Sequence, residues 1–128
     1  MSAKLPILIV NDDEAIHDAI IKIAVDGGYQ FRNAKNAKDA LWEATRYDFS
    51  LALIDLDLPD MPGDEFYDKL QEKESHYSLP VVTFIDSFDT KEVAALNKLL
   101  PKGPITILSK PINEVQLTAL FERYASKA

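Results

Sequence analysis

The chain has 128 residues, of which 47% are hydrophobic and 27% charged, and its net charge is -7. This length suits one domain with a substantial core rather than two. The acidic balance argues against nucleic acid or an anionic membrane as a direct partner, because both require basic surface, and it suits a cation instead. The chain has no cysteine, which excludes disulfides and thiolate metal sites.

The sequence carries no targeting or membrane signal that we can identify. No signal peptide precedes Leu5, and no apolar run approaches the roughly 20 residues that a membrane-spanning helix needs. We therefore expect a cytoplasmic protein.

The chain opens with an apolar strand at residues 5–10, which reads LPILIV. The next segment has apolar residues at helical spacing until Gly27 and its neighbouring glycine, which predicts a helix. A short strand is expected around residues 30–34. A helix over residues 38–47 follows, with Asn36 as its N-cap.

The remaining elements alternate in the same way. A strand, a helix, a strand, a helix and a strand are expected, in that order, at residues 48–55, 64–74, 79–85, 89–100 and 105–109. A last helix follows Pro111, with an apolar stripe formed by Val115, Leu117, Leu120 and Phe121. Alternation of strands and helices predicts an α/β fold, a parallel sheet with helices on both faces. Periodicity gives no strand order.

Acidic residues and a lysine stand where three of these strands end. The third strand contains an apolar run without alternation, residues 51–54, which is typical of a strand buried on both faces, and Asp55 follows it. Asn11-Asp12-Asp13 ends the first strand and Lys110 the fifth. Open α/β sheets hold their ligands at this edge. Three carboxylates near one point raise each other's pKa unless a cation joins them, and oxygen ligands from Asp12, Asp55 and a backbone carbonyl suit Mg²⁺.

These motifs resemble the receiver domain of two-component response regulators. The resemblance is carried by LIVNDDEAIH at the first strand, LALIDLDLPDMPG at the third, LPVV at the fourth and SKP at the fifth. It implies a flavodoxin-like (βα)5 fold, a doubly wound parallel five-stranded sheet with strand order 2-1-3-4-5. It also implies that residues 1–128 form a single receiver domain, a signalling module rather than an enzyme.

The resemblance assigns roles to particular residues. Asp55 is the expected phosphoacceptor, which takes a phosphoryl group from a histidine kinase or phosphotransfer protein, and Pro59 and Gly63 match the family's spacing after it. Asp12 is the expected direct ligand of the Mg²⁺ cofactor, together with Asp55 and the backbone carbonyl of Asp57.

Two further positions near the site follow from the same resemblance. Lys110 is the expected phosphate-binding lysine, and the Lys110-Pro111 peptide is often cis in the family. Asn11 stands where the family usually has an acid. An asparagine can bind a metal-ligated water, but it removes one negative charge and should weaken Mg²⁺ binding.

The sequence departs from the family at the positions that report phosphorylation. Ile85 replaces a Thr or Ser that hydrogen-bonds the phosphate, Asp86 replaces a small residue, and Ile107 replaces a Tyr or Phe. Thr83 lies too deep to substitute, and Ser87 would substitute only if its loop folded inward. We hypothesise that the domain keeps its acceptor but lacks the usual coupling, and that residues 86–90 respond instead.

Two other functions compete with this interpretation. One is a degenerate receiver that acts as a phosphorylation-independent protein interaction module. The other is a flavodoxin-like nucleotide or flavin protein, which the absence of a glycine-rich or hydroxyl-rich loop after the first strand disfavours. If the receiver dimerises, residues 89–100 and 105–109 form the expected interface.

The remaining conspicuous side chains are expected to be structural or exposed. We expect His17 and His76 at the surface, and Trp42 in helix packing.

Overall fold

A computed structural model describes residues 5–56, 58–73, 79–85, 90–103 and 105–125. Within them the strands form one parallel sheet in the order β2-β1-β3-β4-β5. Their bounds are β1 Ile7–Val10, β2 Phe31–Ala34, β3 Leu51–Ile54, β4 Val81–Ile85 and β5 Ile105–Ser109. This order confirms the doubly wound fold expected from the resemblance.

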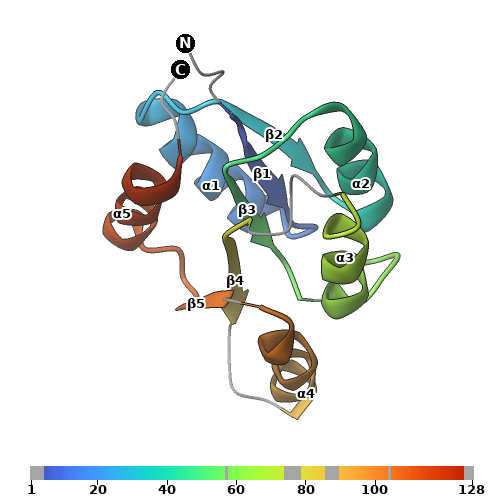
Figure 1. Cartoon of the computed structure of the whole chain (residues 1–128). Helices are drawn as coiled ribbons and strands as arrows, with labels where there is room; N and C mark the ends of the chain where they lie inside the picture. The colour runs from blue at the N-terminus through green and yellow to red at the C-terminus, as the bar shows by residue number, and fades with distance from the viewer. Residues whose placement is uncertain (1–4, 57, 74–78, 86–89, 104, 126–128) are drawn as a thin grey trace.

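Helices cover both faces of the sheet (Figure 1). Their bounds are α1 Glu14–Asp26, α2 Ala37–Arg46, α3 Gly63–Leu70, α4 Thr90–Leu99 and α5 Glu114–Tyr124, with a 3-10 turn at Leu100–Lys102. The first and last helices pack on one face, and the other three on the opposite face. No helix in the described part of the chain is long and apolar enough to cross a membrane.

Strands β1 and β3, which pair with each other inside the sheet, are buried on both faces, as their continuous apolar sequences predict. Every residue of β1 and β3 is buried. Leu8 and Val10 join the core under α2, α3 and α4, whereas Ile7 and Ile9 join the core under α1 and α5. Because both faces are covered, these strands are held firmly and fix the positions of the residues that follow them.

Several expected elements differ in detail. Helix α3 ends at Leu70, since residues 71–73 form a turn rather than the continuation expected to residue 74. Val115 is 79% exposed, so the buried stripe of α5 consists of Leu117 and Phe121, with Leu120 half-buried. Val115 lies in the first turn of the helix, beyond the edge of the core.

The prediction that Trp42 serves helix packing is wrong. Helix α2 turns Ala40 and Ala44 toward the core, and Trp42, midway between them in sequence, projects from the opposite side and is 55% exposed. The guanidinium of Arg46 lies 4.8 Å from the centre of its ring. This cation–π contact gives the exposed indole a partner on its own helix.

Candidate functional site

The register of β1 and β3 places the acidic residues that follow these two strands next to each other at the sheet edge. Val10 pairs with Ile54, so Asn11 and Asp55 are the next residues on adjacent strands. The backbone N–H of Asp55 donates a hydrogen bond of 2.9 Å to the carbonyl of Val10. The sheet therefore holds the start of the acidic loop beside Asp55.

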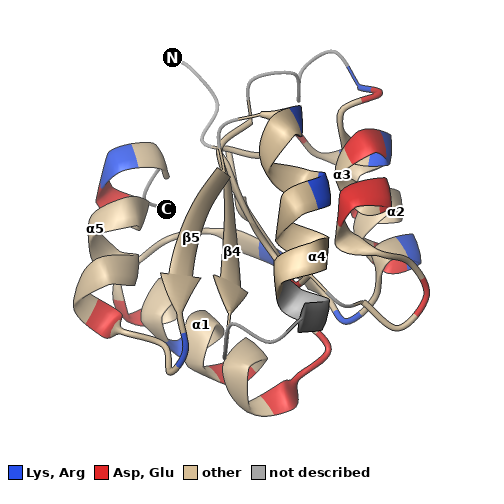
Figure 2. Ribbon diagram, turned by 90° about the horizontal axis from the view of Figure 1, so that it is seen from below, with Lys and Arg blue, Asp and Glu red and all other residues tan. Residues whose placement is uncertain are grey.

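A cleft of about 840 Å³ opens at this edge of the sheet, and Asp12, Asp55 and Lys110 all line it. Its other walls come from the loop between β3 and α3 and from α4, including Met61, Ala94 and Lys98. In Figure 2 the arrowheads of β4 and β5 point to the end of the molecule where acidic segments and a basic one gather. The structure thus brings together residues from the ends of three strands that are far apart in sequence.

Lys110 is held by its backbone. Its N–H donates a hydrogen bond of 2.7 Å to the carbonyl of Ile85, and the Lys110-Pro111 peptide is cis. This places Lys110 at the end of β5, where it lines the same cleft as Asp12 and Asp55.

The expectation that three carboxylates meet at one point is not met among the described residues. No three His, Asp or Glu side chains in that part of the chain gather closely enough to hold a metal ion. Asp13 lines the same cleft and is also the N-cap of α1: its Oδ1 accepts hydrogen bonds from the N–H groups of Ala15 at 3.0 Å and Ile16 at 3.2 Å.

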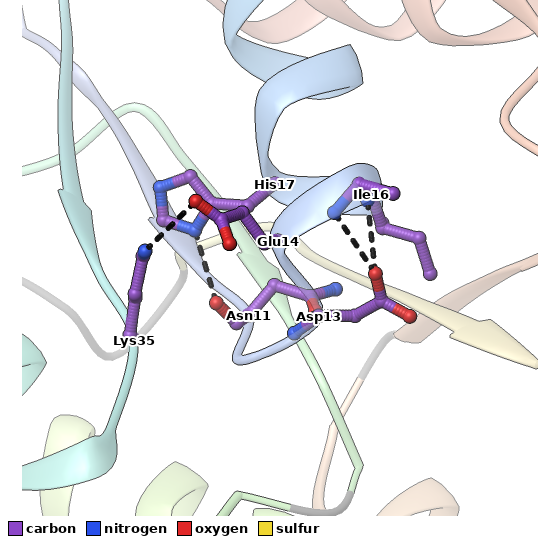
Figure 3. A network of polar contacts seen from close by, with 7 residues as sticks. Asn11, Asp13, Glu14, Ile16, His17 and Lys35 are labelled. Carbon is purple, nitrogen blue, oxygen red and sulfur yellow. Dashed lines mark hydrogen bonds and ion pairs between the residues drawn. The ribbon is translucent and has the colours of Figure 1, made fainter.

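Asn11 is engaged within the loop rather than in the cleft (Figure 3). Its side chain is buried, and its Oδ1 accepts a hydrogen bond of 2.8 Å from the N–H of Asp13. Asn11 is not among the residues that line the cleft. Its amide oxygen therefore already has a partner in the backbone of its own loop.

The prediction that His17 lies at the surface is wrong. His17 is only 2% exposed, and its Nδ1 lies 2.9 Å from the carbonyl oxygen of Asn11. The sequence contained a signal for this burial, because His17 precedes Ile20 and Ala24 at helical spacing and these three residues form the buried face of α1.

Gly63 allows α3 to begin directly against the backbone that follows Asp55. Its N–H donates a hydrogen bond of 3.1 Å to the carbonyl of Leu56. A Cβ at this position would lie 3.0 Å from that same oxygen and 3.2 Å from the carbonyl oxygen of Asp55. Close approach of two backbones therefore accounts for glycine here.

Asp60, in the same loop, caps a different helix. Its carboxylate accepts hydrogen bonds from the N–H groups of Ala37 at 2.8 Å and Lys38 at 2.9 Å, at the start of α2. Burial raises the pKa of Asp60, but these hydrogen bonds and the Lys38 charge outweigh it, so the pKa lies below its ordinary value. The loop that includes Pro59, which lines the cleft, is thereby tied to α2.

Positions 85 and 107, which report phosphorylation in the family, carry isoleucine in this chain, so they have neither a hydroxyl nor an aromatic group. Ile85 is 3% exposed and packs in the core under α2, α3 and α4, whereas Ile107 is 37% exposed. Thr83 is fully buried and its Oγ1 donates a hydrogen bond of 2.8 Å to the carbonyl of Ile54. Its hydroxyl is therefore occupied within the sheet, as the sequence position suggested.

Some expected site residues lie outside the described part of the chain. These are the carbonyl donor Asp57, the acidic replacement Asp86 and its neighbour Ser87. His76, which is expected at the surface, also lies outside it. The hypothesis that residues 86–90 respond to phosphorylation therefore stays a prediction.

The response regulator receiver domain family matches residues 7–122, which include the whole sheet and the cleft residues. The chain belongs to this family. The receiver is 29% identical to the response regulator protein FleR of Pseudomonas aeruginosa over 125 residues, which cover 98% of this chain and 25% of FleR. It is 28% identical over 122 residues to an uncharacterised 14.6 kDa protein of Leptolyngbya boryana, covering 95% of this chain and 91% of that protein.

Solved structures agree with the fold. A CheY-like receiver domain protein from Methanospirillum hungatei JF-1 is 27% identical, with a TM-score of 0.78 and coverage of 94% of this chain and 93% of the other. The receiver domain of the sensor histidine kinase PA1611 from Pseudomonas aeruginosa PAO1, solved with a magnesium ion in its active site cleft, is 20% identical. Its TM-score is 0.81, with coverage of 95% and 98%, a likeness that shows the fold alone.

Proposed function

We propose that this receiver accepts a phosphoryl group on Asp55 from a histidine kinase or phosphotransfer protein, with Mg²⁺ as cofactor. The observation that supports this most directly is the shared cleft of Asp12, Asp55 and Lys110, three residues from separate strands. Membership of the receiver family supports a role in two-component signalling. The chain spans a quarter of FleR and 54% of a second curated relative, so the proposal concerns the receiver function alone.

The donor set in the cleft fits Mg²⁺. This ion prefers oxygen ligands, takes only one or two carboxylates from a protein, and keeps several waters. Asp12 and Asp55 are the carboxylates that would hold it, with the backbone carbonyl of Asp57 as the expected third protein ligand. Because Asn11 replaces an acid, the site has one negative charge fewer than the family pattern, and weaker binding is expected.

In the proposed reaction a carboxylate oxygen of Asp55 attacks the phosphorus of a phosphohistidine on the donor protein. An O–P bond forms and the P–N bond breaks, and the imidazole nitrogen keeps the bonding pair and takes a proton. Bound Mg²⁺ would neutralise charge on the transferred oxygens. Asp55 is partly exposed and therefore accessible to the donor, and the Lys110 ammonium supplies a second positive charge.

A phosphorylation assay with a small donor tests the proposal. The purified chain is incubated with acetyl phosphate and Mg²⁺, and its intact mass is measured. We expect the wild type to gain one phosphoryl group, Asp55→Asn to gain none, and addition of EDTA to prevent the reaction. Asp60→Asn is the matched control, because this carboxylate lies in the same loop but caps α2, and it should be phosphorylated.

A folded wild-type chain that gains no phosphoryl group would contradict the proposal. That outcome would favour the alternative, a degenerate receiver that acts through protein contacts alone. The buried Ile85 and exposed Ile107 are the features consistent with this alternative.

Homodimerisation through α4 and β5 stays a prediction. The described residues of this region include three exposed apolar side chains, Val93, Leu100 and Ile107. Sedimentation of the chain with and without beryllofluoride and Mg²⁺ would measure whether it associates.

A further inference from the structure

His17 is a buried polar group that the proposed reaction does not use. It lies one turn inside α1, and the carbonyl oxygen of Asn11 is the partner of its Nδ1 at 2.9 Å. Burying an imidazole has a cost unless its polar atoms are hydrogen-bonded. The hydrogen-bond partner of His17 is the backbone of the loop that carries Asp12, so the ring is linked to that loop.

The Asn11 carbonyl determines which nitrogen of the His17 ring carries hydrogen. A carbonyl oxygen only accepts hydrogen bonds, so Nδ1 of His17 must carry the hydrogen and donate it. A neutral ring of this kind has its hydrogen on Nδ1 and none on Nε2. The geometry thus defines a tautomer that can be observed directly.

The loop is held on both sides of Asp12, by contacts of Asn11 and Asp13. Before Asp12, the N–H of Asn11 donates to the carbonyl of Ala34 at 3.2 Å, while the Asn11 carbonyl accepts from His17. After Asp12, the N–H of Asp13 donates to the Asn11 side chain at 2.8 Å. These contacts leave the Asp12 side chain exposed and lining the cleft.

Exposed contacts around the loop hold it less firmly than the buried one. The ammonium of Lys35 lies 3.9 Å from a carboxylate oxygen of Glu14, and both side chains are more than half exposed. Such a pair contributes little in water. The buried His17–Asn11 contact is screened much less, and it acts on the residue next to Asp12.

We propose that His17 is a positioning residue for the magnesium site: by donating to the Asn11 carbonyl it holds the acidic loop so that Asp12 faces Asp55. This inference rests on the proposed function and deepens it. It also gives Asn11 a role, since the residue that replaces the family's acid serves as a link between His17 and Asp13 rather than as a source of charge.

The test compares two substitutions of His17. Leucine removes the donor, whereas asparagine places an amide nitrogen where Nδ1 stood. Mg²⁺ binding is measured by calorimetry. Groups that hydrogen-bond metal ligands typically change metal affinity by 10–100-fold, and His17 bonds one residue before the ligand Asp12, so we expect His17→Leu to raise the Kd by about tenfold. His17→Asn should restore binding to within about twofold of the wild type, because it keeps the hydrogen bond to the carbonyl.

A general loss of stability is controlled by Ile20→Val, which alters the same buried face of α1 without touching the loop. It should lower the unfolding midpoint and leave the Kd for Mg²⁺ unchanged. A Kd for His17→Leu equal to that of the wild type would overturn the inference.

A second measurement does not depend on any variant's folding. Nitrogen-15 NMR of the wild-type His17 ring should show hydrogen on Nδ1, and a ring with hydrogen on Nε2 alone would overturn the inference. Wild-type protein that binds Mg²⁺ and is phosphorylated, with His17→Leu binding equally well, refutes the role of His17 only. Wild-type protein that binds no Mg²⁺ refutes both this role and the metal site.

Discussion

The two halves of the sheet's carboxyl edge differ in chemistry. At the ends of β1 and β3, polar groups dominate, and the acidic loop is held by linked hydrogen bonds among Asn11, Asp13 and His17. At the ends of β4 and β5, the family's reporting positions hold Ile85, sealed in the core, and Ile107, partly exposed. The first half is built to hold charge, whereas Ile85 and Ile107, at the reporting positions of the second half, have no hydroxyl with which to sense it.

This difference separates two tasks that the family usually combines. Accepting a phosphoryl group requires a carboxylate, a cation and a lysine, and both Asp55 and Lys110 line the cleft. Reporting the phosphoryl group requires a group on β4 that hydrogen-bonds it, and Ile85 has none. The hydroxyl of Thr83 does not replace it, because that hydroxyl donates to the carbonyl of Ile54.

The largest expected effect comes from removing the lysine. Lys110→Met should slow phosphorylation by acetyl phosphate by about 100-fold, because it removes a positive charge aimed at the transferred oxygens. The rate is measured by intact mass over time. Lys98→Met is the matched control, since Lys98 lines the same cleft from α4, and its rate should stay within about threefold of the wild type. Equal losses in the two variants would mean that only the total charge of the cleft matters.

Placing a hydroxyl at position 85 on β4 tests whether this half of the sheet edge accepts a polar group. Ile85→Val should lower the free energy of unfolding by about 1 kcal/mol, because it deletes one buried methylene. Ile85→Thr has nearly the shape of the valine variant but buries a hydroxyl, and we expect about 1–3 kcal/mol further loss. Urea unfolding measures both. Equal stability of the two variants would show that the hydroxyl finds a partner and that this side of the edge is not closed to polar groups.

The smallest effect concerns the link between the site loop and α2. The pKa of Asp60 is lowered in the folded state, so its carboxylate contributes stability above the unfolded value of 3.8. That contribution is lost as the pH falls through the lowered folded pKa. We expect Asp60→Asn to be slightly less stable than the wild type at pH 7, with the difference shrinking below about pH 4. Thermal unfolding across this range measures it, and a difference that grows on acidification would contradict the assignment.

Much of the fold could be predicted from sequence, because its signals are local. The apolar runs of β1 and β3 and the residues that end them predict where the acids lie. The order of the strands came from the family resemblance, since periodicity carries no information about which strands pair. The ends of elements were less well predicted: α3 ends at Leu70, where a turn replaces the expected last helical residues.

The rest depended on contacts that local patterns do not contain. The link from Asp60 to Ala37 joins residues far apart in the chain. Helical spacing predicts the burial of His17, whereas its polarity predicts the surface. The hydrogen bond to the carbonyl of Asn11 offsets part of the cost of burying the ring. The role of Asn11 in binding a metal-ligated water stays a prediction. Its side chain also accepts a hydrogen bond from the backbone N–H two residues on, as asparagine commonly does in turns.

The central claim is that Asp55 is the phosphoacceptor, and locating the modification tests it most directly. After reaction with acetyl phosphate and Mg²⁺, borohydride reduces an aspartyl phosphate to homoserine, and peptide mass spectrometry identifies the residue changed. We predict homoserine at position 55 only. Homoserine at position 12 or 13, or at no position in a folded and fully reacted sample, would contradict the account.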